Sequence, residues 1–217
     1  PTRRSSDLLT FYRNQGNKIL KRAELLGELT RRERALCVAG THGKTTTTTL
    51  IAHLLRQSTV DCHAFLGGIS NNYQTNFLYS QHSDYAVIEA DEFDRSFHHL
   101  SPYIAVVTSA DPDHLDIYHT PEAYRESFEH FTSLISAEGA LIIRQGIPIT
   151  PRLMKGTRLY TYGLEGEGAD FYASDVRVEE GRLFFTWHHP ALGGLPAGEL
   201  RVELGVPLLV NVENAVA

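Results

Sequence analysis

The residues of this 217-residue chain that could do chemistry gather first in one turn, residues 40–46, which reads Gly-Thr-His-Gly-Lys-Thr-Thr. Glycines let a backbone turn so that successive amide N–H groups point at phosphate oxygens, and a helix that starts there adds the positive end of its dipole. We expect the Lys44 ammonium to reach the outer phosphates of a nucleotide and the Thr45 hydroxyl to hold Mg²⁺. The turn therefore predicts a loop that binds the phosphates of ATP, made by Gly40, Thr41, His42, Gly43, Lys44, Thr45 and Thr46.

The glycine spacing departs from the general phosphate-loop pattern, which places a glycine five residues before the Gly-Lys pair. Val38 stands at that position here, and Gly40 precedes Gly43 by only three residues. The loop is therefore a shortened variant, and this narrows the family to which it can belong.

The flanks of the loop predict a strand before it and a helix after it. Residues 35–39 are an apolar run that fits a buried parallel strand. After the loop come five threonines, Thr45 to Thr49, and then leucines and an isoleucine at the three-and-four spacing of one helix face, at positions 50, 51, 54 and 55. Because threonine is a mediocre helix former, an extended run is the alternative.

Two acidic segments follow strand-like runs. The first, residues 89–92, reads Glu-Ala-Asp-Glu, and the second, residues 111–116, reads Asp-Pro-Asp-His-Leu-Asp. In open α/β sheets the ligand lies beyond the carboxyl ends of the strands, where both segments fall. Mg²⁺ prefers oxygen ligands, so ligand hardness alone favours Asp111, Asp113 or Asp116 as a metal ligand and leaves His114 for orientation. The scattered histidines at positions 98, 99, 188 and 189 are typical of surface or packing residues.

The elements that must position these groups alternate between strand and helix. Residues 85–89, 103–108 and 140–143 are apolar and β-branched, as strands covered on both faces are. A helix is predicted from Pro121, with Thr120 as its cap and an apolar stripe at Tyr124, Phe128, Phe131 and Ile135. The fold class is therefore α/β, with a mostly parallel sheet of the phosphate-loop type flanked by helices.

The two ends of the chain have a different character. Residues 1–34 have a helical pattern and predict a connector packed on the main body. Residues 146–207 carry four short alternating runs between turns, which predict a small antiparallel β subdomain. Between these ends, the glycine-rich segment from Gly67 to Asn76 is predicted to be a loop, explained by turn chemistry or by a substrate contact.

Composition excludes several functional classes. A net charge of −6 argues against nucleic acid as a partner. No apolar run approaches the roughly 20 residues of a membrane span, and the first residues do not form a signal peptide. Cys37 and Cys62 make neither a disulfide framework nor a zinc spacing, and they favour a reducing, cytoplasmic location.

Four motifs in order resemble one family: residues 40–46, residues 89–92, Asp113-His114-Leu115-Asp116 and the terminal Asn211-Val212-Glu213-Asn214-Ala215. They look like the ATP-binding central domain of the Mur ligases, the ATP-dependent amide-forming enzymes of peptidoglycan precursor synthesis. The resemblance covers essentially the whole chain. It is strongest to the branch that joins L-alanine to UDP-N-acetylmuramate.

This resemblance implies roles that the residues alone do not. Lys44, Glu89 and His114 would be the catalytic residues, and Thr45, Glu89 and His114 would hold Mg²⁺. This implication overrides the hardness argument against His114. Asn214 would contact the adenine of ATP, while Gly68 and Asn76 would face the muramoyl substrate.

The resemblance also implies a domain plan. Residues 35–217 would be the central ATP-binding domain. The N-terminal domain that holds the uridine nucleotide and the C-terminal ligase domain would be absent, which would leave the fragment nearly inactive. The missing initiating Met agrees with a fragment.

Two positions depart from the family pattern. Val210 stands where relatives often have a histidine, which removes one expected adenine contact. No lysine occurs between Lys44 and Lys155, so the carbamylated lysine of several relatives is absent, and Glu129 or a neighbour would substitute for it.

Three other functions compete with the L-alanine ligase. A murein ligase that recycles a tripeptide shares the phosphate loop. A nucleotide-binding module would bind ATP without ligating anything. A plain phosphate-loop kinase leaves His114 and the terminal asparagine motif without a role.

Overall fold

A computed structural model describes residues 3–205 and 208–217. Residues 1–2 and 206–207, at the expected ends of the connector and of the antiparallel part, lie outside the described residues. The helices are α1 Arg3–Asn14, α2 Arg22–Thr30, α3 Lys44–Gln57, the 3₁₀ segment η1 Phe93–His99, α4 Leu115–Tyr118, α5 Pro121–Ser133 and α6 Leu209–Val216. The strands are β1 Arg34–Ala39, β2 His63–Ser70, β3 Thr75–Leu78, β4 Tyr85–Glu89, β5 Ile104–Val107, β6 Ala140–Arg144, β7 Arg158–Leu164, β8 Phe171–Glu179, β9 Arg182–His189 and β10 Gly198–Leu204.

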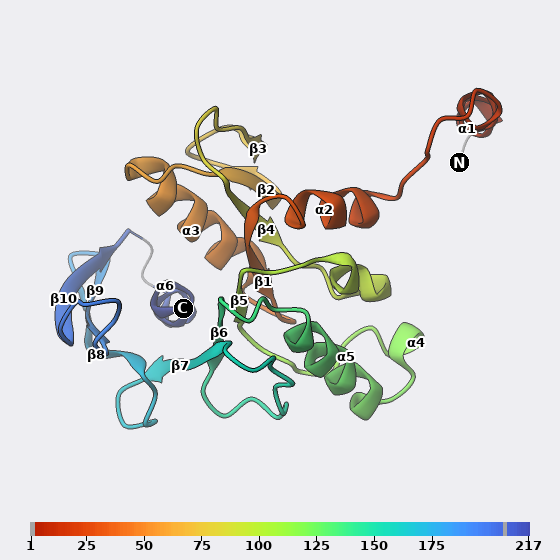
Figure 1. Cartoon of the computed structure of the whole chain (residues 1–217). Helices are drawn as coiled ribbons and strands as arrows, with labels where there is room; N and C mark the ends of the chain where they lie inside the picture. Colours follow the sequence, from red (N-terminus) through yellow and green to blue (C-terminus); the bar gives the residue numbers. More distant parts are fainter. Residues whose placement is uncertain (1–2, 206–207) are drawn as a thin grey trace.

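One 10-stranded sheet runs through the described chain, in the order β10-β9-β8-β7-β6-β5-β1-β4-β2-β3 (Figure 1). The strands at its centre are parallel: β1 pairs with both β4 and β5, and β5 pairs with β6. The expected α/β class with a mostly parallel sheet is confirmed. Because β4 and β5 flank β1, the ends of all three strands meet at one edge, where the phosphate loop begins.

Alternating side chains of β1 cover both faces of the sheet, as the period of a strand requires. Ala35, Cys37 and Ala39 face a core cluster supplied by α2, η1, α4 and α5. Val38 belongs to a second cluster, on the side of α6. A third cluster places Ala52 of α3 against β2 and β4. Both faces of the parallel strands are therefore covered, which explains their apolar sequences.

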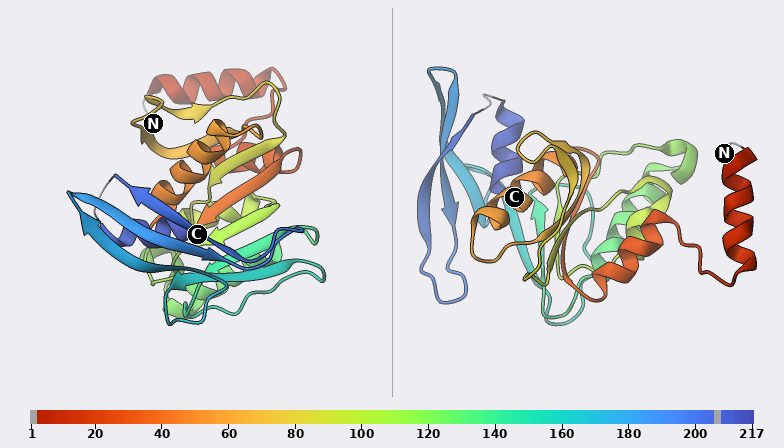
Figure 2. Two further views of the ribbon diagram at one scale, coloured as in Figure 1. Left: turned by 90° about the vertical axis from the view of Figure 1, so that its left-hand side faces the viewer. Right: turned by 90° about the horizontal axis from the view of Figure 1, so that it is seen from above.

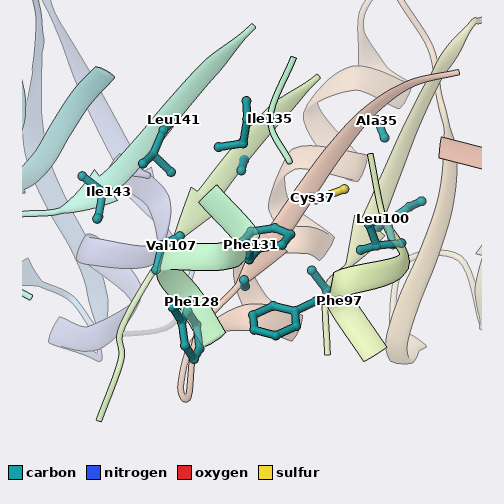
Figure 3. Close-up of a cluster of buried hydrophobic side chains, with 14 of the residues drawn as sticks. Ala35, Cys37, Phe97, Leu100, Val107, Phe128, Phe131, Ile135, Leu141 and Ile143 are labelled. Carbon is teal, nitrogen blue, oxygen red and sulfur yellow. The ribbon is translucent and has the colours of Figure 1, made fainter. Parts of the chain in front are cut away.

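The helix predicted from Pro121 is confirmed. α5 begins at Pro121, and the Ala123 N–H donates to the Thr120 hydroxyl at 3.1 Å. The predicted stripe is fully buried, and its phenylalanines pack with Phe97 of η1 in the core (Figure 3). The stripe contributes packing, as its 3.6-residue spacing indicates.

The threonine run is helical, so the extended alternative is wrong. α3 begins at Lys44, and the hydroxyls of Thr48 and Thr49 each donate at 2.7 Å to the carbonyl four residues earlier. These bonds satisfy polar groups that threonine would otherwise offer to a competing structure. The leucine face is only partly correct, because Leu54 is 67% exposed and the fully buried positions of α3 are Thr47, Thr48 and Ala52.

The predicted glycine loop, from Gly67 to Asn76, is wrong in part. β2 continues through Gly67 and Gly68 to Ser70, and Asn76 lies within β3. Only residues 71–74 form the turn. Local glycine content favours a loop, but pairing of β2 with β3 supplies backbone hydrogen bonds that extend the strand.

The C-terminal strands confirm the antiparallel prediction except in the first of them. β8, β9 and β10 pair antiparallel. β7, however, runs parallel to both β6 and β8. Alternation shows which side chains share a face but not the direction of the neighbouring strand. Residues 145–157 connect β6 to β7 and are long enough for the crossover of about a dozen residues that parallel pairing of these two strands needs. All four strands continue the central sheet.

The N-terminal residues form two separate helices, with residues 15–21 between them. α1 stands apart from the body while α2 packs beside η1, so the expected packing of the connector on the main body holds for α2 and is wrong for α1 (Figures 1 and 2). Gly27 permits this packing, since a Cβ there would lie 2.5 Å from the His99 carbonyl oxygen.

Cys37 and Cys62 are buried and free, and burial raises the pKa of both thiols. Among residues 3–205 and 208–217, none of the helices combines the length and apolar character that a membrane crossing requires.

Candidate functional site

The predicted phosphate loop connects the end of β1 to the start of α3. Its two glycines adopt backbone angles that favour glycine, φ +144° at Gly40 and φ +82° at Gly43. A Cβ at Gly40 would lie 2.0 Å from Thr108 Oγ1, and one at Gly43 would lie 2.4 Å from Asn214 Oδ1. Both positions therefore need glycine for conformation and for space. α3 then presents its N-terminal amides at the loop, the arrangement that binds anions.

Residues that follow β5 hold the loop from one side. Thr108 Oγ1 donates to the His42 carbonyl, and the His42 N–H donates to Ser109 Oγ at 2.8 Å. Thr41 Oγ1 donates to the Asp111 carbonyl at 2.7 Å and lies 2.8 Å from the Tyr124 hydroxyl. Because the Thr41 hydrogen is used on Asp111, the phenol of Tyr124 is the donor in that second bond.

Tyr124 is a loop support that the sequence identified only as a core residue. Burial raises the pKa of its phenol above the usual range, so the phenol stays protonated and can donate. Tyr118 packs edge-on against Tyr124 at 4.9 Å, and its own hydroxyl donates to the Glu92 carbonyl. These two tyrosines connect the loop to the first acidic segment. A single aromatic position in a helix stripe carries no sequence signal for such a bond.

Lys44 lies folded back over the loop. Its Nζ donates to the Gly40 carbonyl at 2.6 Å and to Glu92 Oε1 at 3.0 Å, with Glu92 Oε2 at 2.9 Å. Lys44 is 15% exposed and Glu92 only 2%. A buried carboxylate needs a partner of opposite charge, and Lys44 supplies it. Glu92 is thus a functional neighbour of the lysine that sequence reasoning quoted within its motif without giving it a role.

Glu89 lies at the mouth of the loop, at the end of β4. Thr45 Oγ1 donates to Glu89 Oε1 at 3.1 Å, and the Gly67 N–H donates to Glu89 Oε2 at 2.9 Å. A Cβ on Gly67 would lie 2.2 Å from Glu89 Oε1, so the absence of a side chain there admits the carboxylate. The structure brings together Thr45 and Glu89, as the sequence predicted, and adds Gly67.

His114 contacts a different set of residues. It adopts a left-handed conformation, φ 50°, before α4, and its backbone N–H donates to Asp113 Oδ1 at 2.7 Å. Its ring lies 3.9 Å from Asp113 Oδ2 and edge-on to Phe93 at 5.3 Å. The second acidic segment is mostly exposed. Its Asp111 carbonyl accepts from Thr41 of the loop, whereas the side chains of Asp113 and His114 contact each other.

The donor set at the loop fits one Mg²⁺. The Thr45 hydroxyl and the Glu89 carboxylate are hard oxygen ligands, which Mg²⁺ accepts together with phosphate oxygens and water. Among residues 3–205 and 208–217, no three histidine, cysteine or acidic side chains converge in a way that could hold a metal ion. Thr45 contacts Glu89 directly, while the His114 ring contacts Asp113 and Phe93.

Asn214 lies in α6 beside the start of α3. It is 7% exposed, and Thr47 Oγ1 lies 3.4 Å from its carbonyl and 3.5 Å from its Oδ1. Its neighbour Glu213 pairs with Arg144 of β6 at 2.9 Å, which ties α6 to the sheet. The terminal motif thus packs directly against the loop that it follows by about 170 residues.

The structure places five further residues that the sequence analysis named. Thr46 is exposed on the first turn of α3. A Cβ added at Gly68 would lie 3.7 Å from the Thr45 methyl group, while Asn76 is exposed on β3. Val210 is 56% exposed. Glu129 is engaged elsewhere: its carboxylate accepts from the Thr150 N–H and pairs with Arg152 at 2.7 Å.

A cavity of about 160 Å³ adjoins Glu89 and is lined by α2, η1 and Asp91. Arg22 and Ser96 contribute polar groups to it. A larger hollow of about 520 Å³ lies along α2 and Phe65 and is apolar. The smaller cavity is the one beside the chemical groups.

Comparison with protein families matches residues 38–217 to the Mur ligase middle domain. A UDP-N-acetylmuramate–L-alanine ligase of Porphyromonas gingivalis strain W83 is 64% identical over 209 residues, which are 96% of this chain and 45% of that protein. The enzyme of the same name from Parabacteroides distasonis is 59% identical over 209 residues, 96% of this chain and 44% of that protein. The chain thus spans about half the length of the curated relatives it matches.

Solved structures show the same fold at lower identity. A UDP-N-acetylmuramate–alanine ligase of Thermotoga maritima gives a TM-score of 0.77 at 24% identity, covering 99% of this chain and 47% of that one. A murein peptide ligase of Psychrobacter arcticus gives 0.72 at 23% identity, covering 97% and 48%.

Proposed function

The chain belongs to the Mur ligase family, and on that premise we propose that the full-length protein joins L-alanine to UDP-N-acetylmuramate with the use of ATP and Mg²⁺. Relatives with that name share 59% to 64% of the aligned residues. The 3.1 Å bond between Thr45 and Glu89, beside Lys44, carries the proposal furthest. A hydroxyl and a carboxylate in contact beside a lysine support a metal ion held next to the outer phosphates of a nucleotide.

In this proposal the protein mainly positions its substrates and offsets charge. The loop amides and Lys44 bind the phosphates and stabilise the charge that develops on the transferring phosphoryl group. Thr45 and Glu89 would hold Mg²⁺, which neutralises phosphate charge when bound. The substrate carboxylate attacks the γ-phosphorus and releases ADP, and the amine then displaces phosphate from the resulting acyl phosphate to form the amide.

The polar cavity beside Glu89 supports a place for the muramoyl carboxylate. Arg22 of α2 lines this cavity and offers a positive charge to a carboxylate. Gly68 and Asn76 remain proposed contacts on the β2–β3 side, and His114 remains a proposed ligand of a second Mg²⁺. Asn214 remains the proposed adenine contact.

We also propose the domain plan, with residues 1–34 as connector, residues 35–217 as the central ATP-binding domain and the remaining length of the relatives as further domains. The amino acid and the uridine nucleotide would bind mainly to those other domains. The 217-residue chain alone should therefore ligate poorly. Its two free cysteines agree with a reaction in the cytoplasm.

The test is an assay of ADP release by the full-length enzyme. Release that requires both UDP-N-acetylmuramate and L-alanine supports the proposal. Release that requires the tripeptide instead of L-alanine would establish the murein-recycling ligase, whose fold is shared. Nucleotide binding without amine-dependent release would indicate a non-catalytic module.

A further inference from the structure

Glu92 has contacts that the ligase chemistry leaves without a role. Both of its carboxylate oxygens lie within 3.0 Å of Lys44 Nζ, and the side chain is 2% exposed. The same ammonium donates to the Gly40 carbonyl at 2.6 Å and lies 3.5 Å from the Thr41 carbonyl. An ammonium has three donors, so all three are used. Lys44 must release at least one of these acceptors to bind a phosphate oxygen.

We propose that Glu92 is a positioning residue. Its carboxylate pairs with the Lys44 ammonium over the loop before a nucleotide binds, and the ammonium leaves this pair for the phosphates when a nucleotide binds. The inference depends on the proposed ATP binding at this loop. The ion pair with Glu92 keeps the partly buried Lys44 paired before nucleotide binds, because an unpaired charge in that position would destabilise the loop.

The backbone of Glu92 is held in place, and its side chain is buried. The Glu92 carbonyl accepts from the Tyr118 hydroxyl and from the Arg95 N–H, at the N-terminal end of η1. Tyr118 is itself 1% exposed and packed against Tyr124. Within residues 3–205 and 208–217, Glu92 Oε2 has no hydrogen-bond partner, so Lys44 holds the carboxylate through the hydrogen bond to Oε1 and the ion pair. Lys44 is the more exposed of the two side chains, 15% against 2%, so the ammonium is the group that turns towards a ligand.

This arrangement has a cost for nucleotide affinity. Once Lys44 turns to the phosphates, the fixed negative charge of Glu92 stays a few ångströms from a multiply anionic ligand and repels it. Removing that charge while keeping the shape and an acceptor oxygen should therefore tighten nucleotide binding. A residue with only a structural role would, when changed, weaken binding or leave it unaltered.

The experiment measures the Kd of a non-hydrolysable ATP analogue with Mg²⁺ by calorimetry on the full-length protein. Glu92→Gln should lower the Kd roughly tenfold, whereas Glu92→Asp, which keeps the charge, should stay within about threefold of the wild type. Asp61→Asn is the matched control. It removes one carboxylate of the Arg56 ion pair, 2.6 Å long, at the far end of α3, and should not change the Kd.

An unchanged or higher Kd for a folded Glu92→Gln protein would overturn the inference and leave the proposed function intact. If the wild-type protein itself binds no nucleotide, the proposed function fails first. If Glu92→Gln does not fold, ¹⁵N-lysine NMR of the wild type decides. The Lys44 Nζ signal is assigned with the Lys44→Arg variant and should shift when the analogue is added. A signal that does not shift would overturn the inference that Lys44 leaves Glu92 on nucleotide binding.

Discussion

Two acidic segments of similar composition follow the two strands that flank β1, and the structure treats them differently. The segment after β4 is tied to the loop, since Glu89 bonds Thr45 and Glu92 pairs with Lys44. The segment after β5 is mostly exposed, and His114 contacts Asp113 and Phe93. Position at the carboxyl edge of a sheet is therefore not enough to assemble a site. A segment becomes an assembled site only where buried neighbours fix its side chains.

The largest expected effect on activity is at Lys44, the partner of the first acidic segment. Lys44→Ala in the full-length enzyme should reduce ligation by about 10³-fold or more, because it removes the cation at the transferring phosphoryl group. It also leaves Glu92 buried without a partner, which should destabilise the fold by about 3 kcal/mol. Both quantities can be measured, as ADP release and as denaturant unfolding.

The double variant Lys44→Ala/Glu92→Gln separates these two effects. It removes the unpaired charge and should regain most of the lost stability without regaining activity. A Lys44→Ala enzyme that turns over normally would contradict the assignment of the loop.

Glu89 should show the next largest effect. Glu89→Gln keeps the shape but removes the charge that Mg²⁺ needs, and should lower ligation about 10²-fold. The loss should be partly recovered at high Mg²⁺ concentration, measured as a shift in the Mg²⁺ dependence of ADP release. Equal activity at all Mg²⁺ concentrations would show that Glu89 is not a ligand.

Gly67 should affect the same carboxylate indirectly. Gly67→Ala places a Cβ about 2.2 Å from Glu89 Oε1, so the carboxylate must move. We expect roughly a 30-fold loss of ligation. Gly205→Ala, where an added Cβ would meet no atom within 4 Å, is the control and should not change ligation. An equal loss for Gly205→Ala and Gly67→Ala would contradict this placement of Glu89.

His98 tests how firmly η1, which follows the first acidic segment, is packed. Burial lowers the pKa of this imidazole to about 4, and its Nε2 lies 3.0 Å from the Ser127 carbonyl. The unfolded chain gains this proton below its ordinary pKa of about 6.5, while the folded chain resists it until about 4. Stability is therefore complete above about pH 6.5 and falls as the pH drops towards 4.

At about 1.4 kcal/mol per pKa unit, and allowing for solvent that reaches the half-buried ring, we expect a loss of about 2 kcal/mol. Denaturant unfolding of the 217-residue chain at pH 7 and pH 4 measures it. Carboxylates also titrate in this range, so the difference between wild type and His98→Gln is the quantity to compare. A difference that does not change with pH would mean that His98 is not buried as a neutral base.

His114 should give the smallest effect on ligation, because the second acidic segment is mostly exposed. His114→Ala should reduce ligation about tenfold, because in the proposed function His114 assists a second Mg²⁺ and not the one beside Lys44. Its effect on unfolding should stay within about 0.5 kcal/mol, as for other surface substitutions. A loss as large as that of Glu89→Gln would erase the contrast between the two segments and show that His114 is assembled during turnover.

The central fold was predictable because its signals are local. The strand at residues 85–89 has the predicted bounds, and the helix begins at Pro121 as predicted, since apolar runs and caps act over a few residues. The direction of β7 and the extension of β2 through Gly67 were not predictable. Both depend on the strand that lies alongside, and residue types within the segment do not determine that neighbour.

The sequence by itself determined the loop, its lysine and the family, because a phosphate cradle needs glycines, a cation and a hydroxyl at fixed spacing along a few residues. Only the tertiary structure decided the partners of those residues. Tyr124 supports Thr41, Glu92 holds Lys44, and Gly67 makes room for Glu89. The physical reason is that these contacts join residues 22 to 83 positions apart. Packing of the sheet edge, rather than local propensity, brings such residues within hydrogen-bond distance.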